Sequence, residues 1–230
     1  MKKMTTLMAL AFTGALSTPL WAADAVPHEA GIESEGYVWN KMEGEKLEAL
    51  KARGDALRGE IAFEICQGCH RKGALGRDDG TYPRLAGQHA SVLIKQMTDV
   101  RAGRRDNPKM LPFAGHDALS VQDIADISVY LRSLPSPADN GKGDGKALTK
   151  GKQLYDKDCA TCHADNGEGD GPKFYPRVSG QHYKYLLREA VAIRDGARRN
   201  ANPMMVKAIK KYSDQDLEAL SDYISRFASK

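Results

Sequence analysis

Four cysteines and two histidines in this 230-residue sequence stand at a spacing suited to a redox cofactor. The pattern C-x-x-C-H at Cys66–His70 recurs at Cys159–His163. In this pattern the two thiols form thioethers with the vinyl groups of one haem, and the adjacent His lies under the iron as proximal ligand. The sequence therefore predicts two covalently bound haem c groups. The attachment residues are Cys66, Cys69, Cys159 and Cys162, and the proximal ligands are His70 and His163.

Three other uses of the cysteines compete with haem attachment. A structural zinc site could use two C-x-x-C pairs, but each pair here has its own adjacent His and its own domain. A dithiol oxidoreductase would place its C-x-x-C in a βαβ pattern, which the sequence does not show. A disulfide framework is weaker still, because domains with helical cores of this size do not need one. Haem attachment is the favoured interpretation.

The chain is a tandem repeat with an offset of 93 residues. This offset carries the first C-x-x-C-H onto the second, and it carries Tyr82–His89 onto the similar segment Tyr175–His182. It also relates Ser120, Asp123 and Tyr130 to Ser213, Asp216 and Tyr223. Two copies of one domain explain these matches. We expect domains at residues 59–134 and 149–230, joined by a Pro/Gly-rich linker at residues 135–148.

The sixth iron ligand decides whether such a haem is closed or open to small molecules. Each copy contains an Asn-Pro-x-Met segment, Asn107–Met110 in the first and Asn202–Met205 in the second. The two methionines follow the haem-binding histidines by 40 and 42 residues. Met110 and Met205 are therefore the predicted distal ligands. Met204 is a rival to Met205, because only the spacing from Asn-Pro separates the two.

Other candidate ligands fit the repeat less well. Met97 is matched by Ala190, which favours a core side chain. His89 and His182 form a matched pair, and a bis-His arrangement is an alternative for them. Residues so soon after the proximal loop are more typical of packing or hydrogen bonding, which is the favoured interpretation.

The periodicity within each copy is helical, so the expected fold class is all-α. Ser120 and Ser213 each precede an acid by three residues, which is typical of a helix start. Ser91–Arg101 and Tyr183–Arg194 form a second helical pair, and sustained strand alternation is absent.

The first 22 residues have the layout of a signal peptide. A positive start at Lys2 and Lys3 leads into an uncharged stretch rich in Leu, Ala, Met and Thr, and small residues follow around Ala22. The alternative is an uncleaved membrane anchor, but Gly, Ser, Thr and Pro residues interrupt the stretch. We expect cleavage near Ala22 and a periplasmic protein.

Residues 23–58 form an N-terminal extension with no counterpart in the second copy. A charged helix at Glu43–Arg58 is expected, preceded by the aromatic pair Tyr37 and Trp39. Leu47, Leu50 and Leu57 would give this helix only a narrow apolar stripe, so by itself it would be a marginal helix in water. The favoured hypothesis is that it packs across the first domain and shields that domain's opening helix. The alternative is an acidic, aromatic arm that docks a partner.

The charge balance limits the classes of partner. The chain holds 34 basic and 30 acidic residues, which argues against a nucleic-acid binder driven by phosphate neutralisation. The second copy is the more basic part. Its lysines could orient it towards an acidic partner, although simple solvation explains any one of them. These are Lys150, Lys152, Lys157, Lys207, Lys210 and Lys211.

The motifs quoted above resemble the dihaem cytochrome c4 family over roughly Gly59 to Phe227. The resemblance implies two tandem class I cytochrome c domains, His/Met ligation at both haems, and haem edges that face one another across a pseudo-two-fold interface. Two features depart from the pattern. The first copy is one residue shorter between Gly59 and Cys66 than the second is between Gly151 and Cys159, and the N-terminal extension is not accounted for.

The expected function is electron transfer without bond chemistry, because Met and His would occupy both axial sites. The partners would be redox protein donors and acceptors such as a terminal oxidase or a periplasmic reductase, and peripheral association with a membrane complex is compatible with this role. One alternative is the cytochrome subunit of a larger periplasmic oxidoreductase. A dihaem enzyme is the weaker one. A cysteine-ligated haem would need a fifth cysteine, and a peroxidase would need one open iron.

Overall fold

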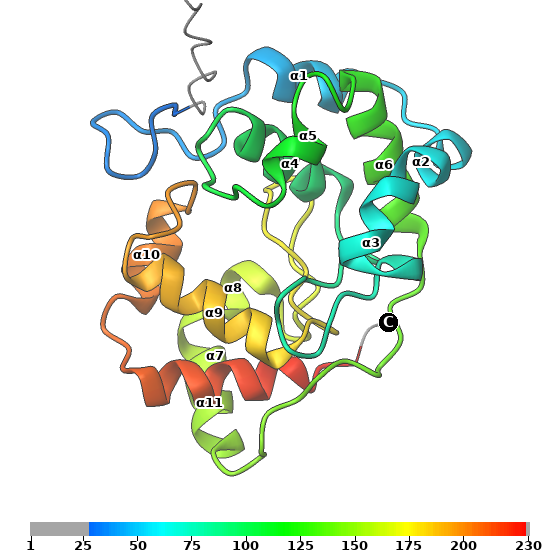
Figure 1. Ribbon diagram of the computed structural model, residues 1–230. Helices are drawn as coiled ribbons and strands as arrows, with labels where there is room; N and C mark the ends of the chain where they lie inside the picture. Colours follow the sequence, from blue (N-terminus) through cyan, green and yellow to red (C-terminus); the bar gives the residue numbers. More distant parts are fainter. Residues whose placement is uncertain (1–27, 229–230) are drawn as a thin grey trace, which may run out of the picture.

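The computed structural model describes residues 28–228, which fold into two helical halves placed side by side (Figure 1). The expected signal peptide, residues 1–22, lies outside the described residues. Strand-type pairing in the described part is limited to one bridge between Asp170 and Tyr175. The all-α class and the two tandem domains are confirmed.

The first half contains α1 (Gly44–Lys51), α2 (Ala56–Phe63), the 3-10 turn η1 (Glu64–Cys66), α3 (Gln67–His70), the 3-10 turn η2 (Lys72–Ala74), α4 (Ala90–Arg101), α5 (Leu111–Ala114) and α6 (Val121–Ser133). The second half contains α7 (Leu148–Asp158), α8 (Ala160–His163), α9 (Tyr183–Arg194), α10 (Pro203–Ile209) and α11 (Asp214–Ser225).

Equivalent helices pack in the same way in both halves. The first helix of each copy crosses the last one, α2 against α6 and α7 against α11. A glycine stands at each crossing. A Cβ on Gly59 would lie 2.1 Å from the Asp126 carbonyl oxygen, and one on Gly151 would lie 2.2 Å from that of Ala219. The two helices of each domain approach so closely only because these residues have no side chain.

We therefore predict that Gly59→Ala and Gly151→Ala each destabilise their own domain by about 1–3 kcal/mol, the usual cost of overpacking. The obstacle is backbone, which a rotamer change cannot relieve. Gly68→Ala is the matched control, because nothing lies within 4 Å of a Cβ built there. Chemical denaturation measures all three variants. A Gly59→Ala protein as stable as Gly68→Ala would show that the helices can separate without loss.

The expected helix starts are present at Ser120 and Ser213. Each serine accepts from the backbone N–H three residues on, and the acid there, Asp123 or Asp216, accepts from the serine N–H. These reciprocal bonds satisfy two backbone donors at each helix start. The helices that follow fill two separate cores. The first core includes Ile124, Ile127 and Leu131, and the second includes Leu217, Leu220 and Ile224.

The expected single helix at Glu43–Arg58 is wrong. The chain forms α1, breaks at residues 52–55, and restarts as α2. Asp55 causes the restart, because its carboxylate accepts from the N–H groups of Leu57 and Arg58, while its own N–H donates to Asp126 on α6. The extension does pack across the first domain, because α1 lies on α4 and α6. It does not shield the opening helix α2, where Leu57 and Ile61 stay exposed.

The connection between the halves is held in place by both of them. The Arg84 guanidinium of the first half donates to the carbonyl of Pro137 and to the Asp139 carboxylate. Asn140 is buried and donates to the carbonyls of Gln181 and Ser225 in the second half. The linker therefore helps to fix the arrangement of the two domains.

Candidate functional site

The first C-x-x-C-H motif lies on a short helical stretch that ends at its histidine. Cys66 closes η1, and Cys69 and His70 belong to α3. Arg71 then adopts φ 65° and ψ 164°, a conformation that non-glycine residues rarely take. This residue stops the helix at His70. The His70 Nδ1 lies 3.3 Å from the Pro83 carbonyl oxygen.

The second motif repeats this geometry. Cys159 is the N-cap of α8, which ends at His163, and Ala164 adopts φ 62° and ψ 166°. The His163 Nδ1 lies 3.0 Å from the Pro176 carbonyl oxygen. Two non-glycine residues in the same strained conformation, each directly after its histidine, indicate that the turn serves the site. Such strain persists only where the surrounding structure holds it.

The residues present fit a covalently attached haem at both motifs. A carbonyl oxygen only accepts, so each Nδ1 carries the proton and leaves Nε2 with a free lone pair for a metal. Burial lowers the pKa of His70 and of His163, which keeps both imidazoles neutral as a ligand must be. None of the four cysteines forms a disulfide, so all four are available for thioether bonds to haem. Residues 28–228 contain no cluster of three or more His, Cys, Asp or Glu side chains able to hold a metal ion, which disfavours the zinc alternative.

The methionines separate clearly by burial. Met110 packs against the first core and Met205 against the second. Met204 instead leaves 69% of its surface exposed. Met97 is a buried member of the first core, in agreement with the packing role expected for it. These positions support Met110 and Met205 as distal ligands, which stays a prediction.

The Asn-Pro pairs position the two methionine segments differently. Asn202 caps α10 by accepting from the Met204 N–H, and Pro203 begins the helix, so Met205 lies inside its first turn. In the first domain the Asn107 side chain accepts from the Met110 N–H at 3.2 Å, and α5 begins only after Met110.

The paired histidines His89 and His182 join the two domains. His89 Nε2 lies 2.7 Å from the Glu168 carbonyl oxygen, and His182 Nε2 lies 2.7 Å from that of Leu75. Each contact crosses the interface, and the two are related by the repeat offset. The structure therefore favours hydrogen bonding over ligation for both residues.

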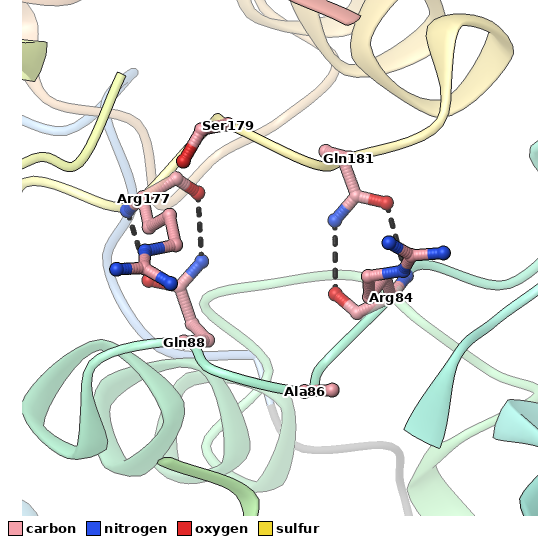
Figure 2. Close-up of a pocket in the computed structure, with 6 residues that line it drawn as sticks. All are labelled: Arg84, Ala86, Gln88, Arg177, Ser179 and Gln181. Carbon is pink, nitrogen blue, oxygen red and sulfur yellow. Dashed lines mark hydrogen bonds between the residues drawn. The ribbon is translucent and has the colours of Figure 1, made fainter. Parts of the chain in front are cut away.

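Two glutamines make a second matched pair of contacts across the interface (Figure 2). The Gln181 side-chain amide donates to the Arg84 carbonyl and accepts from the Arg84 N–H, both at 2.9 Å. Gln88 makes the same two bonds with the backbone of Arg177, again at 2.9 Å. Each side-chain amide satisfies one backbone N–H and one backbone carbonyl of the other domain, which would otherwise lack a partner at the interface. The pattern predicts that the domains dock by a pseudo-two-fold rotation.

A partly buried charged cluster also crosses the interface. Arg105 donates to Gln96 of its own domain and to Glu189 of the other. Arg198 does the reverse and donates to Glu189 of its own domain and to Gln96 of the other. Burial alone would raise the pKa of Glu189, but Arg198, Arg105 and Arg188 outweigh it and hold the pKa below its usual value. Sequence reasoning missed this cluster, although the offset of 93 relates Gln96 to Glu189 and Arg105 to Arg198.

The docking of the domains should weaken in mild acid because of His182. Its Nδ1 accepts from the Gly141 N–H at 3.1 Å while Nε2 donates to the Leu75 carbonyl, an arrangement that only the neutral ring allows. The pKa of His182 lies below its ordinary value of 6.5, because burial and, to a smaller extent, the positive charge of Arg84 lower it. The hydrogen bond to Leu75 and the charges of Asp78 and Asp139 raise the pKa, but not enough to offset burial. The unfolded chain then takes up the proton first, so this contribution is full above about pH 6.5 and declines as the pH falls through that value.

The prediction is that the wild type loses melting temperature more steeply than His182→Gln between about pH 7 and pH 5. Glutamine keeps polar atoms at the position but does not titrate. Parallel losses in the two proteins would show that His182 does not carry the effect.

The fold and the two motifs define a c-type cytochrome with two haem domains. A family model described as Cytochrome c matches the chain twice, over residues 56–135 and 148–227. Cytochrome c4 from Azotobacter vinelandii is 37% identical over 191 residues, covering 75% of this chain and 89% of that protein. The chain belongs to the cytochrome c4 family. It carries two covalently bound haem c groups and transfers electrons without acting as an enzyme.

Two further comparisons agree with this assignment. The crystal structure of reduced recombinant cytochrome c4 from Pseudomonas stutzeri aligns with a TM-score of 0.68 and 31% identity, over 76% of this chain and 100% of that one. A protein from Stutzerimonas stutzeri (strain A1501), named thiosulfate dehydrogenase electron acceptor, is 33% identical over 179 residues, covering 74% of this chain and 82% of that protein. In residues 28–228 no helix has the length and apolar character needed to cross a membrane.

Proposed function

We propose that this chain shuttles electrons in the periplasm from a donor such as a dehydrogenase to an acceptor such as a terminal oxidase or a periplasmic reductase. The observation that carries the proposal is the matched pair of sites, each with a neutral His directly after its cysteine pair and a Met packed against the core of the same domain. Bound haem would supply a one-electron ferric/ferrous couple. With His and Met both held by the iron of each haem, neither iron would keep a vacancy for substrate.

The site residues divide into three roles under this proposal. Cys66 and Cys69 attach the first haem, and Cys159 and Cys162 attach the second. His70 and His163 bind iron through Nε2 while their Nδ1 atoms are fixed by Pro83 and Pro176. This second hydrogen bond orients each ring and raises its basicity. Met110 and Met205 close the opposite sides.

The division of the chain is part of the proposal. Residues 1–22 act as a signal peptide cleaved near Ala22, which places the mature protein in the periplasm. Residues 23–58 form the extension. The haem domains span residues 59–134 and 149–230, with the linker at residues 135–148 between them. The double family match at residues 56–135 and 148–227 supports this division.

The two domains present different surfaces to partners. Leu57 and Ile61 on α2 and Ile65 on the following turn η1 are exposed apolar side chains at four-residue spacing, with 75%, 69% and 62% of their surfaces exposed. With Gly59 and Gly151 aligned, the corresponding residues of the second domain are Thr149, Gln153 and Lys157. We therefore propose that the first domain meets a partner through apolar contact and the second through charge.

Four of the six candidate lysines of the second domain bind groups of the same domain. Three of the six lysines pair with carboxylates of the same domain, namely Lys150 with Asp216, Lys152 with Asp156 and Lys211 with Asp158. The Lys210 ammonium donates to the Arg194 carbonyl. Lys157 and Lys207 are exposed and are the better candidates for steering an acidic partner.

A role as the cytochrome subunit of a larger periplasmic oxidoreductase is the second candidate, and a relative named as the electron acceptor of a dehydrogenase favours it. Gentle purification from periplasm separates the two functions. A shuttle should elute at the size of the free chain and exchange electrons with more than one partner. Co-purification with one enzyme in fixed ratio would instead establish a subunit.

A further inference from the structure

Residues 28–43, here called the strap, lie across the junction of the two domains (Figure 1). The Glu29 N–H donates to the Ala102 carbonyl of the first domain, and the Ile32 N–H donates to the Arg199 carbonyl of the second at 2.8 Å. The Arg199 guanidinium donates back to the Glu29 carbonyl and pairs with Glu33. Gly31 approaches so closely that a Cβ there would lie 2.9 Å from the Arg199 Cβ.

The Trp39 side chain of the strap packs against the second haem domain. The Trp39 ring lies parallel to that of Tyr175, with 6.3 Å between centroids, and meets Phe174 edge-on at the same distance. On its other side the Lys95 ammonium, from α4 of the first domain, lies 5.3 Å from the indole centroid. Trp39 therefore fills a position between the two domains that their own residues leave open.

Tyr175 connects Trp39 to the second haem attachment. Tyr175 immediately precedes Pro176, whose carbonyl oxygen lies 3.0 Å from the His163 Nδ1. The repeat gives Tyr82 as the counterpart in the first domain, with its ring centroid 5.9 Å from that of His70. Over the Tyr82 ring lies the guanidinium of Arg77, 5.4 Å from the centroid, where the second domain has an indole. The strap thus makes two otherwise equivalent sites unequal.

We propose that Trp39 is a positioning residue for electron transfer: acting through Tyr175, it keeps water from the second haem site beside His163 and raises the reduction potential of the second haem relative to the first. The inference rests on the two-haem carrier proposed above. The ferric haem carries one positive charge more than the ferrous form, so a drier and less polar surrounding disfavours it. The strap lies outside the family match, which begins at residue 56, and so is an addition to the shared cytochrome fold.

The test is a redox titration of the full-length holoprotein, with proton NMR following the haem methyl resonances of each domain separately. In Trp39→Ala the second haem should be reduced at a lower potential, so that its reduced-to-oxidised ratio at the wild-type midpoint falls several-fold. The first haem should titrate as before. Trp39→Phe should restore most of the wild-type behaviour, because it keeps a ring against Tyr175.

Two further variants separate shielding from general damage. Val38→Ala is the matched control, because its side chain is 54% exposed and should leave both potentials unchanged. Glu33→Ala removes a contact of the strap with Arg199 but leaves Trp39 in place. Like Trp39→Ala, it should lower the reduction potential of the second haem. Unchanged titration of Trp39→Ala, or equal shifts at both haems, would overturn the inference. Two haems of equal potential in the wild type would also overturn it. A wild type that takes up fewer than two electrons per chain would instead overturn the proposed function.

Discussion

Replacing Met205 by Ala is expected to abolish the near-infrared absorption of the methionine-to-ferric-iron bond in the second domain while leaving its haem attached. The thioethers of Cys159 and Cys162 do not depend on the distal ligand. The reduction potential of that haem should fall, because a thioether ligand stabilises the ferrous state. Axial ligands span a range of roughly 0.8 V, so this is the largest redox effect expected of any single substitution.

Met204→Ala is the matched control for this experiment. Its side chain is exposed, whereas Met205 packs against the second core. The control should retain the absorption and both potentials. If Met204→Ala loses the band and Met205→Ala keeps it, the register of the Asn-Pro-x-Met segment is wrong.

The largest effect on domain docking is expected for Glu189→Ala. This change leaves Arg105 and Arg198 partly buried at the interface without their shared carboxylate. Removing one partner of a fully buried ion pair costs about 3–5 kcal/mol, and water that reaches these side chains reduces the cost here to about 1–3 kcal/mol. The free energy of unfolding should fall by this amount. Exchange of the interdomain amides of Arg84 and Arg177 should accelerate.

The repeat itself supplies the control for Glu189. Its counterpart in the first domain is Gln96, which accepts from both arginines as a neutral amide. Glu189→Gln therefore keeps an acceptor and loses only the charge, and it should cost less than the alanine variant. Equal losses for the two variants would show that the charge of Glu189 alone, and not the packing and hydrogen bonds that glutamine retains, holds this part of the interface.

The haem sites were predictable because their chemistry is local. Two thiols and an imidazole reach one haem only at the C-x-x-C-H spacing, so Cys66, Cys69 and His70 identify the first site without tertiary information. The helix starts at Ser120 and Ser213 were predictable for the same reason, since each cap is completed within four residues. Duplication reinforced both predictions by supplying every pattern twice.

The interface was not predictable, because its partners are distant in sequence. Gln181 bonds to the backbone of Arg84, 97 residues earlier, and neither residue type indicates such a contact. The break between α1 and α2 was missed because periodicity alone continues through it. Asp55 starts α2 after the break, and its own N–H is held by Asp126, 71 residues later. The course of the strap likewise depends on Arg199, 166 residues beyond Glu33.

A carrier with two covalently attached, six-coordinate haems should take up two electrons per chain and leave no iron open to carbon monoxide. An optical redox titration of the purified holoprotein, with carbon monoxide added once both haems are reduced, measures both properties. We expect two one-electron steps per chain and no change in the ferrous spectrum on adding carbon monoxide, because Met110 and Met205 close both irons. Uptake of a single electron, or a carbon monoxide complex at either haem, would show that the chain is not such a carrier.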